Sequence, residues 1–146
     1  MHICFISSEY PIWKSGGVGS FLQTFSRAMV NRGHTISIVG IGDQPKEIQL
    51  NDDGVNIYRL PISKLPAAKF LSNVRHINAK IKQLHKENKI DIVESAEMGL
   101  VFQHKIKAIK YCIRLHGGHH FFSESENRNV HWWQGFKEKL SFKKAD

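Results

Sequence analysis

The sequence predicts a doubly wound α/β domain with a mainly parallel, Rossmann-like sheet. Three observations lead to this fold class: short apolar runs recur along the chain, helical patterns separate them, and turn residues divide one from the next. The chain has 146 residues, of which 41% are hydrophobic and 23% charged. This length and composition suit one soluble domain with a core of its own.

The first predicted strand, Ile3–Ser7, is a short apolar run of the kind that a parallel sheet covers on both faces. A polar loop that contains Pro and Gly follows, from Ser8 to Gly19. Apolar residues then recur at helical spacing up to Gly33, which is typical of a helix end; they are Phe21, Leu22, Phe25, Ala28 and Met29. Thr35–Ile41 is the second predicted strand.

The middle of the chain continues the alternation. Residues Gly42–Gly54 are turn-like and polar, and we expect no element there. In Val55–Leu60 apolar and polar residues alternate, and the run ends at Pro61, which suggests a third, edge-like strand. A long helix, roughly Ala67–Glu87, has an apolar stripe suited to covering a sheet, although a basic amphipathic helix could also lie on a membrane. Its basic residues, expected on the rest of its surface, are Lys69, Arg75, Lys80, Lys82 and Lys86.

The last third of the chain supplies two more strands. Ile90–Val93 and Tyr111–Leu115 are the fourth and fifth predicted strands, and a short helix is expected between them near Met98–Ile109. Val130–Lys144 has the pattern of a final helix. Its aromatic residues are interpreted as helix core or as a domain contact rather than as a carbohydrate-stacking platform; they are Trp132, Trp133 and Phe136.

Three segments with unusual residues follow three of the predicted strands. They are Gly16–Gly19 after the first strand, Glu94–Glu97 after the fourth and His116–His120 after the fifth. In doubly wound sheets, ligands bind beyond the carboxyl ends of the strands, where the strand order reverses. We therefore expect these segments to meet around one crevice.

The glycine segment consists of Gly16, Gly17, Val18 and Gly19, directly before the first helix. Glycines let backbone N–H groups approach an anion, and the start of a helix adds partial positive charge. We predict a phosphate or sugar contact here, with a simple flexible turn as the alternative. The dinucleotide fingerprint is excluded, because a long insert separates the strand from the glycines and the G-x-G-x-x-G spacing is absent.

The other two segments contain one candidate site residue each. Glu97 either caps the helix expected after it or binds a sugar hydroxyl. His116 ends a central strand and projects into the crevice, unless it is a structural histidine that bonds a neighbouring loop. More histidines lie nearby, but their spacing matches no standard zinc motif, so we expect no metal site; they are His119, His120 and His131.

The charge balance is 21 Lys and Arg against 13 Asp and Glu, a net charge of +8. This surplus favours anionic partners such as nucleotide phosphates or phospholipid headgroups, with a solvated basic face as the alternative. We expect no nucleic-acid partner. Cys4 and Cys112 lie in strand-like runs, which indicates free buried thiols. No leader or membrane-length apolar run is visible, so a cytoplasmic protein is expected, with contact to the inner face of the membrane left open.

Taken in order, the motifs resemble those of the N-terminal domain of family-4 glycosyltransferases, which have the two-domain GT-B fold. Ile3–Pro11 is similar to the first strand and loop of that family, and Gly16–Gly19 to its glycine loop. Further similar segments are Asn31–His34, Asp91–Ser95 and Arg114–Gly117. Lys143–Asp146 resembles the helix end that precedes the next strand of the family.

The resemblance implies a retaining enzyme that transfers a hexose from a nucleotide sugar to a glycan or lipid-linked acceptor, without a metal or other cofactor. It implies that the glycine segment approaches the donor phosphates and the acceptor, and that His116 contacts the transferred sugar. In that family the donor-binding carboxylates and the basic phosphate clamp belong to a second domain, which is absent from this sequence.

Residues 1–146 are therefore expected to be a truncated acceptor-side domain that is inactive alone. We also expect it to self-associate through the uncovered apolar side of its last helix. The alternative function is a non-catalytic α/β module that binds a nucleotide, a polyanion or a membrane surface.

Overall fold

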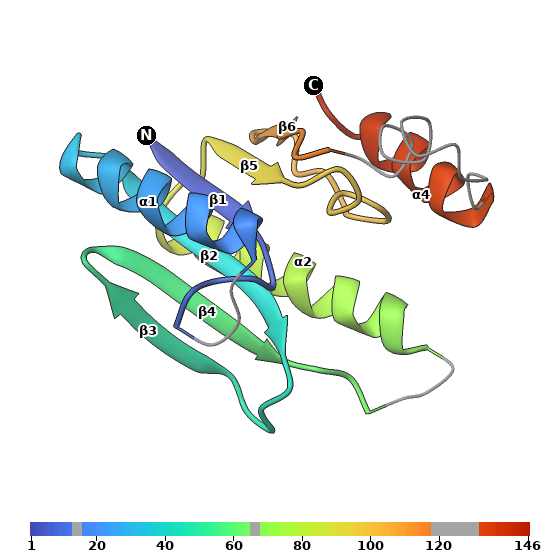
Figure 1. Ribbon diagram of the computed structural model, residues 1–146, viewed down its shortest axis with the longest axis horizontal. Coiled ribbons are helices and arrows are strands. Elements are labelled where there is room, and N and C mark those ends of the chain that lie inside the picture. The colour runs from blue at the N-terminus through green and yellow to red at the C-terminus, as the bar shows by residue number, and fades with distance from the viewer. Residues whose placement is uncertain (13–15, 65–67, 118–131) are drawn as a thin grey trace.

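The computed structural model describes residues 1–12, 16–64, 68–117 and 132–146, and a six-stranded sheet lies at its centre (Figure 1). The strand order is β3-β4-β2-β1-β5-β6. Only the pair β3 and β4 is antiparallel, and the other four pairs are parallel. The strands are β1 (His2–Ile6), β2 (Thr35–Gly42), β3 (Ile48–Asp52), β4 (Val55–Pro61), β5 (Ile92–Ser95) and β6 (Lys110–Ile113). The predicted fold class is confirmed, with the first strand in the interior of the sheet.

Two helices cover opposite faces of this sheet: α1 (Gly17–Asn31) and α2 (Lys69–Glu87). Side chains alternate along a strand, so Phe5 of β1 packs in the same cluster as Leu22 of α1, whereas Cys4 packs in the cluster of α2 that contains Ile77. The predicted role of the α2 stripe as a cover for the sheet is thus confirmed. Within the described segments, no helix has the length and apolarity to cross a membrane.

The strand predicted at Val55–Leu60 lies toward an edge of the sheet as expected, although β4 is not the outermost strand, because a sixth strand, β3, pairs with its outer side. This strand falls in the range expected to be polar turns. The position of β3 at the edge of the sheet explains why its sequence shows no strand pattern, since Ile48 is exposed and the strand buries little apolar surface. Asp53 and Gly54 form the turn between β3 and β4 with φ of 49° and 85°, and an Asp-Gly pair is a known hairpin signal.

No helix forms in the range 98–109, so that prediction was also wrong. The segment runs as successive turns whose N–H groups donate to carbonyls three residues back. Phe102 has φ of 57°, which a regular helix does not hold. The N–H of Leu100 donates to Ser141 Oγ at 3.1 Å, so the final helix fixes this connection.

The final helix, α4 (Trp132–Phe142), turns its small and polar side inward, and its buried residues are Gly135, Glu138 and Ser141. Trp132 is 75% exposed, and Trp133 and Phe136 are exposed as well. The interpretation of these aromatic residues as helix core was therefore wrong. The predicted histidines His119, His120 and His131 lie outside the described residues.

Lys80 is more buried than its predicted position on the polar face of α2, whereas the two cysteines are close to the prediction. Lys80, expected on the polar face of α2, is only 8% exposed; its Nζ pairs with Glu47 and lies 4.9 Å from the ring centroid of Tyr58. Both cysteines are free thiols as predicted, although only Cys4 is fully buried and Cys112 is half-buried. Burial raises the pKa of the Cys4 thiol to about 12, so this sulfur stays protonated at neutral pH.

A partly buried carboxylate, that of Asp52, ties the β3–β4 hairpin to α1. Asp52 accepts hydrogen bonds from Tyr10 Oη at 2.6 Å, from Gln23 Nε2 at 3.1 Å and from both Nε and Nη2 of Arg27. The Arg27 hydrogen bond is the largest cause that lowers the pKa of Asp52 from 3.8 to about 2. The charged form of Asp52 therefore stabilises the folded state.

We expect Asp52→Asn to destabilise the protein by about 1–2 kcal/mol at neutral pH, since one pKa unit corresponds to about 1.4 kcal/mol and the half-exposed Arg27 is partly screened. Because the folded-state pKa is depressed, this stabilisation is complete above pH 4 and is lost as the pH falls from about 4 to 2. Urea unfolding at several pH values checks this. The control is Asp43→Asn, whose carboxylate is exposed; equal pH profiles for wild type and Asp52→Asn would contradict the assignment.

Candidate functional site

The site lies where the strand order reverses, since β1 pairs with β2 on one side and with β5 on the other. A crevice of 30 Å³ opens at the carboxyl ends of these strands. Its lining comes from β1, α1, β5 and the segment after β6: Phe5, Ile6, Ser7, Val18, Phe21, Leu22, Glu94, Ser95, Ala96, Arg114 and His116. Each predicted segment contributes to this lining, through Val18, through Glu94–Ala96 and through His116. Gly16, Gly17, Gly19 and Glu97 are not among the lining residues, and residues 118–120 lie outside the described residues. The roles of the site residues stay predictions.

The glycine segment forms the start of α1 rather than a loop before it. Gly16 is the residue before the helix and gives no side-chain cap, while Gly17, Val18 and Gly19 form the first turn. The N–H groups of a first turn have no partner within their own helix, and they form the positive end of its dipole. Because Gly16 and Gly17 are exposed, an anion can approach this end.

The glycines differ in what surrounds them. A Cβ built on Gly17 meets no atom of the described residues within 4 Å, so these residues leave the space at Gly17 open. A Cβ on Gly19 would lie 3.3 Å from both Glu9 Cβ and Tyr10 N. Gly17 therefore leaves room for a ligand, whereas Gly19 lets the helix pack against the loop that follows β1.

This loop is held by several hydrogen bonds. Ser7 Oγ accepts a hydrogen bond from the Glu9 N–H and donates one to the Glu9 carbonyl, both at 3.1 Å. Arg59 Nη1 donates to the Ser8 carbonyl at 2.6 Å. Gly40 of β2 lies so close that a Cβ there would be 1.9 Å from the Ser7 carbonyl oxygen. The loop and the start of α1 are thus built on the interior strands of the sheet.

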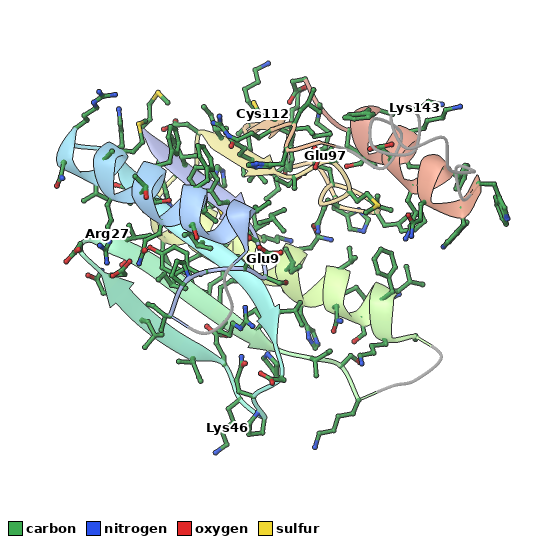
Figure 2. The ribbon with its side chains drawn as sticks, in the orientation of Figure 1. Glu9, Arg27, Lys46, Glu97, Cys112 and Lys143 are labelled. Atoms are coloured by element: carbon green, nitrogen blue, oxygen red, sulfur yellow. The ribbon has the colours of Figure 1, made fainter. Side chains whose placement is uncertain are left out.

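His116 is held by a buried carboxylate. Its backbone N–H donates to Glu97 Oε1 at 2.5 Å, and its ring lies edge-on to Phe21 with 5.5 Å between the centroids. Glu97 comes just after β5 (Figure 2). Since no helix follows it, capping does not explain this residue. Glu97 positions His116, and its direct contact with a sugar hydroxyl stays a prediction.

Two residues at the crevice were not predicted as site residues. The Arg114 guanidinium donates to both carboxylate oxygens of Glu94, and it lies 5.0 Å and 4.9 Å from the ring centroids of Phe21 and Phe25. The ion pair and the aromatic rings together brace the wall beside His116. The segments Asp91–Ser95 and Arg114–Gly117 contain these two residues, but the pairing of Glu94 with Arg114 depends on the register of β5 and β6.

Comparisons with known proteins bear on the family and the fold of the chain. The model for the family "Glycosyltransferase Family 4" matches residues 15–146, whereas no curated protein sequence matches the chain. The chain is similar to a solved structure of sucrose-phosphate synthase from Thermosynechococcus elongatus, with 14% identity and a TM-score of 0.69 over the whole chain. It spans 41% of that structure.

A second similar structure is the catalytic domain of starch synthase IV from Arabidopsis thaliana, bound to ADP and acarbose. The identity is 12% and the TM-score 0.54, with 82% of this chain and 34% of that chain covered. At these identities the two structures bear on the fold, and both support a Rossmann-like α/β domain.

Proposed function

The chain belongs to glycosyltransferase family 4, and we propose that it is the N-terminal, acceptor-side domain of a retaining hexosyltransferase. The donor is a nucleotide sugar, and the acceptor is a glycan or a lipid-linked glycan. The observation that carries this proposal is the meeting of the open start of α1 and His116 at one crevice at the switch point of the sheet. A second domain, which supplies most donor contacts, completes the enzyme; the 41% coverage of the synthase structure supports this.

In the proposed reaction the bond between the anomeric carbon and the diphosphate oxygen breaks, and the diphosphate takes the electron pair. The acceptor hydroxyl oxygen forms the new bond to the anomeric carbon, and its proton leaves on the diphosphate. The N–H groups of Gly17 and Val18 stabilise the developing negative charge, as preorganised dipoles do. The proposal requires no metal or other cofactor.

His116 contacts the transferred sugar in this proposal. Its support is positional: the Glu97 carboxylate fixes its backbone, and the ring of Phe21 packs against its imidazole. Fixed side chains of this kind place a substrate without a cost at the moment of reaction. Glu97 and Phe21 therefore act as positioning residues for His116.

We also propose a cytoplasmic enzyme that contacts the inner face of the membrane. The net charge of +8 and the exposed aromatic residues of α4, Trp132, Trp133 and Phe136, support this contact. Self-association through the same face is the competing proposal. Sedimentation of the protein with and without anionic vesicles separates the two.

Residues 1–146 alone are expected to transfer no sugar and to bind uridine- and guanosine-diphosphate sugars with dissociation constants in the millimolar range. Each charge-assisted contact missing from the diphosphate weakens binding by about 1.5–3 kcal/mol, and about 1.4 kcal/mol is a ten-fold change. Isothermal titration calorimetry measures this. The chain with Gly17→Val is the control, because it removes the space before α1 and should abolish the remaining heat.

Micromolar binding or turnover by residues 1–146 would place the whole donor site in this chain and contradict the half-enzyme proposal. Transfer with inversion by the full-length protein would contradict retention. Binding of nucleotide sugars without any transfer by the full-length protein would favour the non-catalytic module.

A further inference from the structure

A second, larger cavity of 570 Å³ adjoins the crevice of the proposed donor site. The two share Ile6, Ser7, Val18 and Ala96 in their linings. The larger cavity extends from the carboxyl ends of the strands to the face of α2, and Glu9 lies between the start of α1 and α2 (Figure 2). A molecule in this cavity would lie next to a sugar held at His116.

The wall on the side of α2 is apolar. Phe70, Val74 and Ile77 contribute from α2, and Met98 and Val101 from the segment after β5. Phe70 and Met98 are both exposed although they border a cavity. An apolar portion of a ligand placed here would remove this surface from water, which favours binding in proportion to the area buried.

Two oxygen atoms among the lining residues have no hydrogen-bond partner in the described part of the chain: Glu9 Oε2 and Gln103 Oε1. Both atoms are buried, and Gln103 is only 3% exposed. Buried acceptors without a donor destabilise the folded state, so a ligand that presents hydroxyl groups would satisfy them. Gln103 also borders a neighbouring cavity of 300 Å³, so Glu9 gives the cleaner test.

The charge of the cavity separates two classes of acceptor. Among the described lining residues Glu9 is the single charged side chain, and none is Lys or Arg. A phosphorylated acceptor in this cavity would place its negative charge near the Glu9 carboxylate, with no described basic side chain in the lining to offset it, and like charges repel. None of the described basic residues of the chain lines this cavity.

We propose that this cavity is the acceptor site and that it binds an uncharged, hydroxyl-bearing sugar with an apolar substituent. The sugar hydroxyls donate to Glu9 and Gln103, and the apolar substituent packs on Phe70 and Val74 of α2. This inference rests on the proposed function, because it names the acceptor of that transferase.

The test is an NMR titration of residues 1–146 with octyl glucoside, octyl galactoside and octyl mannoside, each below its critical micelle concentration. Glucose 6-phosphate, galactose 6-phosphate and mannose 6-phosphate serve as charged probes. We expect at least one octyl glycoside to shift the amide signals of Val74, Ile77 and Gly99, and the phosphates to leave them unchanged. Glu9→Gln should weaken octyl glycoside binding about three- to ten-fold. The difference in affinity between the octyl glycosides and the sugar phosphates should become smaller.

Glu87→Gln is the matched control, because Glu87 is an exposed carboxylate at the far end of α2. Failure of all octyl glycosides to bind, shifts confined to α4, tighter binding of a phosphate in this cavity, or an unchanged Glu9→Gln titration would each overturn the inference. The titration contains no nucleotide sugar. Acceptor binding without transfer would therefore overturn the proposed function alone, whereas transfer exclusively to phosphorylated sugars would overturn this inference alone.

Discussion

Gly40→Ala is expected to destabilise the protein by about 3 kcal/mol or more, or to prevent folding. The added Cβ would lie 1.9 Å from the Ser7 carbonyl oxygen and 2.8 Å from its carbonyl carbon. Both atoms belong to the backbone of the loop after β1, so no side-chain rotation relieves the overlap. The loop is also fixed by Arg59 and by the Ser7 hydroxyl. Either β2 or this loop must move, and the site moves with it.

Chemical unfolding and the far-UV circular dichroism spectrum measure the effect. The matched control is Gly17→Ala, in which the same methyl group enters open space and should change the free energy of unfolding by less than about 1 kcal/mol. Equal stability of Gly40→Ala and wild type would mean that the loop after β1 is not held against β2, and the geometry of the site would have to be revised.

The second large effect is expected for Gly17→Val, which should lower sugar transfer by the full-length enzyme about 100-fold or more. A branched side chain at Gly17 occupies the space through which the diphosphate reaches the N–H groups of α1. Loss of one such stabilising donor typically lowers the rate by about 10²–10³. The melting temperature should change little, because no atom of the described part of the chain lies within 4 Å of the added Cβ. Steady-state kinetics and a thermal melt measure both quantities.

Gly19→Val serves as the comparison, since a Cβ there would crowd the backbone of Tyr10. This variant should lower the melting temperature as well as the activity. If Gly17→Val unfolds the protein, Gly17 has a backbone role, and the anion site at α1 loses its support. If Gly17→Val is stable and fully active, the donor does not approach this end of the helix.

Sequence periodicity was sufficient for much of the fold because buried strands and covering helices have strong local patterns. The apolar run at Ile3–Ser7 and the stripe on α2 led to the correct class, and their positions led to the crevice at His116. The edge strand β3 was missed because Ile48 faces solvent and its neighbours are polar. The Asp53-Gly54 turn was the available signal.

The remaining site features depend on contacts between distant segments. Nothing local in the sequence indicates that the Glu97 carboxylate accepts the N–H of His116, or that Arg114 pairs with Glu94 across two strands. The prediction of a helix at 98–109 was wrong for a similar reason, because this segment is held by a contact with a distant element: the N–H of Leu100 donates to Ser141 Oγ of α4. Nothing in the local sequence marks Glu9 as a site residue; its place in the lining of the larger cavity follows from the packing of α1 and α2 around the loop after β1.

We propose above that the start of α1 and His116 contact the diphosphate and the sugar of the donor. An NMR titration of residues 1–146 with uridine- and guanosine-diphosphate sugars tests it most directly, because it locates weak binding by residue. We expect the largest amide shifts at Gly17, Val18 and His116, and we expect Gly17→Val to abolish them. Shifts elsewhere with these three residues unchanged, at donor concentrations of tens of millimolar, would contradict it.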